Sequence, residues 1–483
     1  MGEGSRATAE LLHTTPTGDA AWSIETHGID IIPEGERHGK PAELFWLWLA
    51  TNVIITYVIE GIIVASLGLS FFWAVAAIVI GNLFYFVVGA CGLPGPVAGT
   101  GTLVIGRASF GRRGGAFPTF LSWVTIVGWE AVNFVLGTFA LVALVQQVGI
   151  PVNTTVKAIC LGLTIIVTFA VAILGHATIV RLQTIFTWVL GAVVLGVLIQ
   201  VLQHANFNAS VATLAASSPF ATFILAVVIV AGLGPLSYVN LVADYNRYLP
   251  RATRGRSMIG WVVLGSIIPA ILITLIGLMA AGATDMTDPI GGFKPLLAGW
   301  YFVIFMVIVV IGSMMNNVVG IYSGGLQLLA LGLKIDRWKT IPLDGVLATG
   351  ASVYAVFFHD FTSSMIQFLS LYIIWLAPWC AIYLTDMWMR RNRYNSQELV
   401  RDRGGEYWYR NGYNVGALVA WVVGAIVAGL TLNTTLWSSY VVTHVIGGAD
   451  VSIPAGMLAA GLTYFFLNRR PAQMPSAATA AVK

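Results

Sequence analysis

The sequence predicts an all-α membrane protein with twelve transmembrane helices, and three observations lead to this prediction. Hydrophobic residues make up 57% of the 483 positions and charged residues only 10%, and the mean hydropathy is +0.83. Twelve apolar runs are long enough to cross a bilayer. The basic residues collect in alternate connections between these runs. Because soluble domains carry about 25% charged residues, the composition excludes a soluble domain, a soluble enzyme and a disordered protein. The net charge of only +4, spread over short basic clusters, excludes a nucleic-acid binder.

The expected spans follow from the length of the apolar runs. About 20 helical residues cross the ~30 Å hydrocarbon core of a bilayer, and the ~10-residue alternating segments of a membrane barrel are missing. No apolar segment follows a basic start, so residues 1–42 are predicted to be a polar tail and not a signal peptide. The half-polar stretch 434–450 is predicted to be a loop. In order, the predicted spans are 44–68, 71–92, 116–146, 156–175, 180–203, 219–243, 258–283, 296–332, 342–358, 364–388, 413–432 and 451–468.

The basic residues predict the orientation of these spans. With both termini in the cytoplasm, 23 of the 25 lysine and arginine residues fall in cytoplasmic segments, and only Lys157 and Lys294 fall outside. This asymmetry is what positive-inside insertion requires. We therefore expect a multi-pass protein of the plasma (cytoplasmic) membrane, with cytoplasmic tails at 1–42 and 469–483 and a cytoplasmic loop at 390–412.

The sixth predicted span contains helix-breaking residues near its middle. Gly232, Gly234 and Pro235 weaken a helix and free backbone groups. In a membrane such a break persists where it lines a cavity. A proline kink without a function is the alternative.

The first span has a milder counterpart of this break, at Asn52, Thr56 and Glu60-Gly61. Broken helices at corresponding positions of two halves mark the substrate site of inverted-repeat transporters. Spans 1 and 6 correspond if the two repeats are spans 1–5, at 43–203, and spans 6–10, at 204–389. The last two spans then form a separate unit at 413–468.

Two acidic residues, Glu60 and Glu130, lie within predicted spans 1 and 3. A carboxylate within a membrane span is unfavourable and usually faces a cavity or a proton pathway. The alternative is a protonated carboxyl group that is hydrogen-bonded between helices.

Several amide and aromatic residues in the spans are candidates for ligand contacts. Trp129 and Asn133 are four positions apart and so share one helix face. An aromatic ring stacked on a flat heterocycle, with an amide at its edge, is sound chemistry, although interhelical packing explains the same pair. Asn316 and Asn317 in span 8 point in different directions, so one can face a cavity while the other bonds a neighbouring helix.

The sequence carries no pattern of a metal site or an enzyme. Cys91, Cys160 and Cys380 are far apart in apolar stretches, and the seven histidines are scattered. Because no catalytic dyad, metal cluster or pore-ring pattern stands out, a membrane enzyme and a channel are disfavoured against a transporter. We expect no catalytic residue, no metal and no cofactor other than a coupling ion.

Five short motifs stand out, at 24–37, at 50–55 with Gly61, at 107–111, at 128–133 and at 243–250. They resemble those of the nucleobase–cation symport family, specifically its purine–cytosine permease branch. The Gly-Trp-x-x-x-Asn of span 3 is the most specific of them, and the order and spacing of all five strengthen the match. The resemblance covers roughly residues 24–468.

The resemblance implies a LeuT-type fold with a 5+5 inverted repeat, two additional C-terminal helices and alternating access. It implies a planar base bound at mid-membrane between spans 1, 3, 6 and 8. Trp129 would stack on the base, Asn133 would lie at its edge, and Asn316 would hydrogen-bond the ring. The broken segment from Gly232 to Pro235 would offer backbone groups.

Two departures from the family pattern bear on the ligand and the ion. Gly320 and Ile59 stand where fungal relatives carry a second asparagine and a serine, which leaves the exact base open. Where sodium-coupled members use hydroxyl groups of span 8, this chain has Met315 and Asn316, with Ser313 out of register. An oxygen cage for sodium would therefore contain few hydroxyl groups.

The expected function is a secondary symporter that imports cytosine, purines or both, together with a cation. The membrane carboxyl groups favour a proton, with Glu60, Glu130 and Asn52 as candidates for coupling. Glu60 and Glu130 are also candidate substrate contacts. Sodium coupling remains an alternative, as does another nitrogen heterocycle such as allantoin, a hydantoin, uracil or a vitamin-type ring.

Asp244 and Arg247, at the inner end of span 6, are expected to form part of a gate. The expected partners are the small-molecule substrate and the lipid bilayer, and the oligomeric state is left open.

Overall fold

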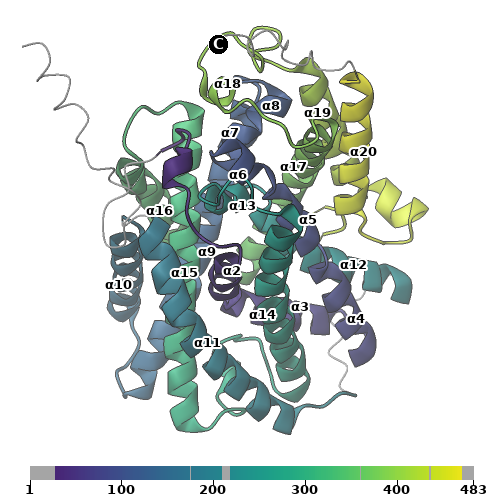
Figure 1. The fold of residues 1–483 in the computed structure, drawn as a ribbon. Coiled ribbons are helices and arrows are strands. Elements are labelled where there is room, and N and C mark those ends of the chain that lie inside the picture. Colours follow the sequence, from purple (N-terminus) through teal and green to yellow (C-terminus); the bar gives the residue numbers. More distant parts are fainter. Residues whose placement is uncertain (1–27, 174–175, 209–217, 359–360, 435–436, 470–483) are drawn as a thin grey trace, which may run out of the picture.

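The chain folds into a bundle of long helices with short helical turns at both ends (Figure 1). This computed structural model describes residues 28–173, 176–208, 218–358, 361–434 and 437–469. The regular structure of these residues is helical, apart from two isolated β-bridges. Most of the two predicted tails, at 1–27 and 470–483, lies outside the described residues.

Helices occupy all twelve predicted spans. Within the described residues, ten spans have the length and hydropathy needed to cross a membrane if the bent first pair counts as one. The remaining two, α19 and α20, are apolar but shorter, at 17 and 16 residues. In order, the spans are α2 Glu43–Asn52 with α3 Ile55–Ser66; α4 Phe71–Asn82 with α5 Tyr85–Cys91 and α6 Pro94–Ala98; α9 Ala116–Gln147; α10 Thr154–Ala172; α11 His176–His204; α12 Pro219–Leu233 with η2 Pro235–Tyr238 and α13 Val242–Asn246; α14 Gly255–Ala283; α15 Gly299–Leu331; α16 Ile341–Phe357; α17 Phe361–Met389; α19 Val415–Thr431; and α20 Ser452–Leu467.

Three of these helices begin at a side chain that caps them. At the start of α10, the side-chain oxygen of Asn153 accepts a hydrogen bond from the backbone N–H of Val156 at 2.9 Å. Ser218 and Asn414 do the same for α12 and α19. Each cap satisfies a backbone donor that has no partner within its own helix.

The first span breaks directly after Asn52, the first of the three places that the sequence analysis named. The helix axis bends by 58° between α2 and α3, at Val53 and Ile54. Glu60 and Gly61 instead lie inside the regular helix α3. The role of Gly61 is close packing, because a Cβ atom there would lie 2.0 Å from the backbone oxygen of Thr274 in α14. Of the three expected places, Asn52 adjoins the break, whereas Thr56 and Glu60-Gly61 lie inside α3.

The sixth span breaks where Gly234 and Pro235 predict it. Helix α12 ends at Leu233, the 3₁₀ turn η2 follows, and the chain returns to α-helix only at Val242. The carbonyl group of Gly232, at this break, accepts a hydrogen bond from the hydroxyl group of Tyr372 in α17. The break is thus compensated by a side chain from another span.

Short helical turns and buried arginine side chains close one end of the bundle, which we call the arginine-rich end. The arginines lie between chain segments and bind backbone carbonyl groups: the guanidinium of Arg107 donates to Leu399 and Ala330 at 2.9 and 2.8 Å. Burial lowers the pKa of Arg107 to about 9, so it stays charged at neutral pH. The turns at this end are η1 Glu34–Glu36, α7 Thr102–Ile105, α8 Arg107–Phe110, η4 Arg337–Thr340 and α18 Ser396–Val400, whereas η3 Gly291–Phe293 and the π-helical turn η5 Val441–Val445 lie in other connections.

Candidate functional site

A small cavity lies where the two broken spans meet α9 and α15. Its volume is about 40 Å³, which is room for a few water molecules at the ~10–15 Å³ that one water requires. The residues around it come from the breaks of spans 1 and 6 and from the middle of spans 3 and 8. Those used below are Tyr57, Trp129, Glu130, Asn133, Tyr238 and Asn316.

The indole ring of Trp129 forms one wall of this cavity and is supported by two further aromatic rings. The indole ring of Trp129 packs edge-on against Phe368, with centroids 5.6 Å apart, and lies 6.1 Å from the ring of Tyr372. The buried indole nitrogen of Trp129 has no hydrogen-bond partner. The wall therefore combines a flat apolar surface with a free N–H donor, the combination that a planar polar ring requires.

A chain of amide and hydroxyl groups lies beside the aromatic wall. The side-chain nitrogen of Asn133 donates to the side-chain oxygen of Asn316 at 2.9 Å. The nitrogen of Asn316 lies 3.0 Å from both the hydroxyl oxygen of Tyr238 and the backbone oxygen of Thr51. The side-chain oxygen of Asn133 is buried without a partner. One hydrogen-bond network thus joins spans 3, 6 and 8 to the break of span 1. The side-chain oxygen of Asn133 is an acceptor in this network that a ligand could use.

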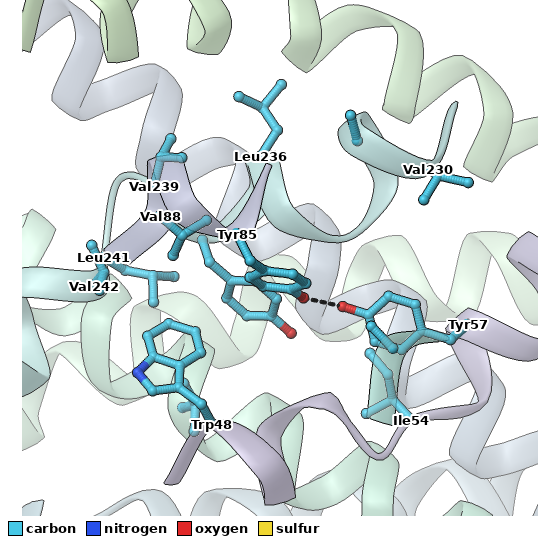
Figure 2. Close-up of a cluster of buried hydrophobic side chains, with 14 of the residues drawn as sticks. Trp48, Ile54, Tyr57, Tyr85, Val88, Val230, Leu236, Val239, Leu241 and Val242 are labelled. Atoms are coloured by element: carbon cyan, nitrogen blue, oxygen red, sulfur yellow. Dashed lines mark hydrogen bonds between the residues drawn. The ribbon is translucent and has the colours of Figure 1, made fainter. Parts of the chain in front are cut away.

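A second polar cluster joins the broken first span to span 2. Figure 2 shows the hydroxyl group of Tyr85 pointing at that of Tyr57, with the oxygen atoms 2.5 Å apart. Both hydroxyl oxygens also lie within hydrogen-bond distance of the side-chain oxygen of Asn52, at 2.6 and 2.5 Å, so the two hydroxyl protons are shared among three contacts. The nitrogen of Asn52 donates to the carbonyl group of Trp48. Asn52 therefore holds the end of α2 and does not line the cavity.

The two predicted membrane carboxyl groups occupy different places. Glu130 lines the cavity, is 1% exposed, and has no partner on either carboxyl oxygen. Glu60 is fully buried outside the cavity lining, where the hydroxyl group of Thr274 in α14 donates to it at 3.2 Å. The structure thus brings Glu130 to the aromatic and amide groups and sets Glu60 between helices.

The glycine and proline residues of the sixth span shape the break without lining the cavity. A Cβ atom on Gly234 would lie 2.7 Å from the ring of Tyr57, and one on Gly232 would lie 2.9 Å from Ile373. Gly234 therefore lets the ring of Tyr57 approach the backbone, while Leu233 and Ser237, on either side of Pro235, line the cavity.

The two predicted gate residues bind different segments at the arginine-rich end. A carboxyl oxygen of Asp244 accepts hydrogen bonds from the backbone nitrogen and the hydroxyl group of Thr102, at 2.7 and 3.0 Å. The guanidinium of Arg247 donates to the carbonyl group of Gly28 at 2.6 Å and to the hydroxyl group of Tyr322 at 2.9 Å. This end of span 6 is thereby tied to the segment before span 1, to the loop after span 2 and to span 8.

Four of the eight predicted substrate contacts line the cavity, namely Trp129, Glu130, Asn133 and Asn316. The sequence analysis missed the tyrosines Tyr57 and Tyr238, although both lie beside a break. An aromatic hydroxyl group within a turn of a helix break would have been a usable signal, because a break leaves backbone groups that need partners.

The structure brings together two cysteines that the sequence analysis treated as unrelated. The sulfur atoms of Cys91 and Cys380 lie 3.7 Å apart, and both side chains are free thiols. Among the described residues no group of three or more histidine, cysteine or acidic side chains is placed to hold a metal ion.

Comparison with known proteins identifies the family. The family described as permeases for cytosine/purines, uracil, thiamine and allantoin matches residues 31–453, which is most of the chain. The chain belongs to this family of permeases. It is therefore a multi-pass membrane transporter and not an enzyme.

Curated relatives agree with this assignment. The chain is 28% identical over 454 residues to the putative purine-cytosine permease YxlA of Bacillus subtilis, covering 92% of this chain and 96% of that protein. It is 23% identical over 477 residues to the purine-cytosine permease FCY21 of Saccharomyces cerevisiae, covering 92% of this chain and 86% of that protein.

A solved structure supports the fold. Mhp1, a nucleobase-cation-symport-1 family transporter in a closed conformation with bromovinylhydantoin bound, superposes with a TM-score of 0.73 at 19% identity, covering 92% of this chain and 96% of Mhp1. The predicted LeuT-type fold, with its inverted repeat and two further C-terminal helices, is confirmed.

Proposed function

We propose that this permease is a secondary symporter that imports cytosine, purines or both together with a proton by alternating access. The observation that carries the proposal is the hydrogen-bonded chain Asn133–Asn316–Tyr238 beside the ring of Trp129. It offers a stacking surface and edge-reading amides at the point where two spans break. In this proposal the repeats are 43–203 and 204–389, and the arginine-rich end faces the cytoplasm of the plasma membrane.

The free polar atoms around the cavity suit the edge of a nucleobase. The side-chain oxygen of Asn133 and the carboxyl group of Glu130 accept hydrogen bonds, and the indole N–H of Trp129 donates one. Cytosine and the purines present adjacent donors and acceptors on one edge. A cavity of about 40 Å³ is smaller than such a ring, so substrate entry requires the helices to separate. This is consistent with alternating access.

Two observations favour a proton over sodium as the coupling ion. The backbone oxygen of Thr51 next to the first break accepts a hydrogen bond from Asn316, so it already has a donor where a sodium ion would require a free ligand. The carboxyl group of Glu130 is buried without a partner, and an isolated buried carboxylate is strongly disfavoured unless it binds a proton or a cation.

The first prediction concerns transport by the full-length protein in proteoliposomes. We expect an inward proton gradient to accumulate labelled cytosine, and a protonophore to abolish the accumulation. Adenine, hypoxanthine, uracil, allantoin and pyridoxine serve as unlabelled competitors that rank the substrates. Accumulation that follows a sodium gradient at fixed pH would contradict proton coupling. A competitor that displaces cytosine completely at lower concentration would move the substrate to another heterocycle.

The second prediction concerns the amide pair. We expect Asn133→Ala and Asn316→Ala each to weaken substrate binding, and the double variant to lose less than the sum of the two losses. The reason is that the two side chains form one hydrogen bond, and residues in one network usually couple by about 0.5–3 kcal/mol. Equilibrium binding of labelled cytosine to the three purified variants measures the coupling. Strictly additive losses would show that the two amides contact the substrate independently.

The family description keeps a second class of substrate open. It names uracil, thiamine and allantoin beside cytosine and purines, and Mhp1 holds a hydantoin. Gly320 lines the cavity and provides space where fungal relatives have an amide, which favours a larger or differently substituted ring if cytosine fails as a substrate.

A further inference from the structure

A third acidic side chain, missed by the sequence analysis, is buried near Glu130. Asp344 lies in the first turn of α16 and is fully buried. One of its carboxyl oxygens accepts a hydrogen bond from the indole nitrogen of Trp123 at 2.5 Å, and the other has no partner. Asp344 lies only two residues inside the predicted span 342–358, and the sequence analysis grouped it with the acidic residues of the loops.

The two acids are linked through one face of α9. Trp123 and Glu130 are seven residues apart, so they lie two turns apart on the same side of the helix. Trp123, at the turn nearer the start of α9, donates a hydrogen bond to Asp344. Glu130, two turns further along α9, lines the cavity. Both carboxyl groups therefore lie along this face of α9, and they share no hydrogen bond with each other.

Two glycines of span 8 leave space beside the face of α9 that carries Trp123 and Glu130. Gly320 and Gly324 are one turn apart on α15, and both face the side chain of Ile126 in α9. A Cβ atom on Gly324 would lie 3.3 Å from the unpartnered oxygen of Asp344. Gly320 lines the cavity. A glycine face therefore runs from the cavity towards Asp344.

Among the described residues, no basic side chain forms an ion pair with Glu130 or Asp344. The nearest cations in the sequence, on η4, are engaged elsewhere: Arg337 stacks on the ring of Tyr322 at 4.8 Å, and Lys339 pairs with Asp336 at 2.6 Å. Two nearby acids that are buried without a cation cannot both be ionised at low cost. The pair therefore keeps at least one proton. The charged groups on the other helices packed against α16 are Lys157, at the opposite end of α10, and Asp386 of α17, which pairs with Arg390 at 2.9 Å.

We propose that Glu130 and Asp344 form a two-carboxyl proton site in which Asp344 takes the coupling proton from the cavity towards the arginine-rich end. Because the two carboxyl groups share no hydrogen bond, a water molecule relays the transfer: the O–H bond of the Glu130 carboxyl group breaks, the water accepts this proton and releases one of its own, and an O–H bond forms on the free carboxyl oxygen of Asp344. Glu130 becomes a carboxylate, Asp344 becomes neutral, and the total charge of the pair is unchanged. The inference rests on the proposed proton symport, and Asp344 completes the path because it lies one turn from the end of its helix.

The first test needs no substrate. Dicyclohexylcarbodiimide adds to protonated carboxyl groups in apolar surroundings, and mass spectrometry of the purified full-length protein locates the adduct. We expect labelling of Glu130 or Asp344 that falls as the pH rises, with no labelling of the exposed, ion-paired Asp336. Absence of an adduct on both buried acids at every pH would overturn the proposal.

The second test separates proton coupling from substrate exchange. Counterflow exchanges labelled for unlabelled substrate without net proton movement, whereas accumulation requires the proton. For Asp344→Asn we expect proton-driven accumulation to fall about tenfold or more while counterflow stays within about threefold of the wild type. Asp336→Asn is the matched control and should resemble the wild type in both assays. Asp344→Asn accumulation equal to that of the wild type would overturn the proposal, whereas absence of wild-type counterflow with any base would instead overturn the proposed function.

Trp123→Phe keeps the inference testable if Asp344→Asn fails to fold. This variant retains the carboxyl group and removes the N–H donor that stabilises its ionised form. We expect the pH of half-maximal uptake to move about one unit towards alkaline pH, with counterflow preserved. An unchanged pH profile in Trp123→Phe would show that Asp344 is only a packing residue.

Discussion

Replacement of Trp129 with alanine is expected to weaken substrate binding about 5- to 150-fold, because stacking of a base on an aromatic ring contributes about 1–3 kcal/mol. The indole ring lines the cavity and is held edge-on by Phe368, so its face is preorganised for a planar ligand. Its N–H group is buried without a partner, and a ligand acceptor would satisfy it. Equilibrium binding of labelled cytosine to the purified variant measures the loss.

Trp129→Phe separates the contributions of the ring and the N–H group. Phenylalanine keeps a stacking surface and removes the donor, so its loss of binding should lie between those of the wild type and the alanine variant. Trp300→Ala is the matched control, since this tryptophan lies in α15 and is 68% exposed, away from the cavity. Equal binding by the wild type and Trp129→Ala would remove Trp129 from the site.

The spans and the break of span 6 could be predicted because they depend on local chemistry. A run of about 20 apolar residues has few alternatives to a membrane helix, and Gly234 and Pro235 weaken a helix wherever they occur. Trp129, Asn133 and Asn316 were also predictable, since polar side chains within a span need a partner or a ligand. These features do not require knowledge of which helices are neighbours.

The sequence located the break of span 1 only within the range from Asn52 to Gly61, because tertiary contacts set its exact position. Val53 and Ile54 are β-branched and apolar and carry no helix-breaking signal in a membrane segment. The helix ends there because Asn52 is held by the hydroxyl groups of Tyr57 and Tyr85. Gly312 of span 8 also leaves room for the backbone oxygen of Val53, which would lie 2.7 Å from a Cβ atom at that glycine.

Pairs that join distant segments were likewise hidden from the sequence. Trp123 and Asp344 are 221 positions apart, and Cys91 and Cys380 are 289 positions apart. Each partner has an unremarkable local context, and only the packing of the inverted repeats brings them together. Knowledge of the family fixes the fold but not these contacts, because they depend on residues at individual positions of this chain.

Gly277→Ala is expected to lower the thermal stability of the purified protein strongly, because spans 1 and 7 pack backbone to backbone. A Cβ atom at Gly277 would lie 2.0 Å from the carbonyl oxygen of Val58, and the reciprocal position, Gly61, faces the carbonyl oxygen of Thr274 at the same distance. A Cβ atom has no rotamer that avoids such a clash, so α3 and α14 must separate. Overpacking typically lowers the free energy of unfolding by about 1–3 kcal/mol. Because the clash here is with backbone, we expect a loss at the upper end of this range.

Gly260→Ala in the same helix is the matched control for this prediction. Nothing lies within 4 Å of a Cβ atom at Gly260, and alanine stabilises a helix interior by about 0.5–1 kcal/mol relative to glycine. We expect this variant to melt at or above the wild-type temperature in detergent, and Gly277→Ala to melt well below it or to aggregate. Equal melting temperatures for the two variants would contradict the close approach of α3 and α14. Because α3 carries Tyr57 to the cavity, any Gly277→Ala protein that folds should also bind substrate less well, which links the packing of these spans to the geometry of the site.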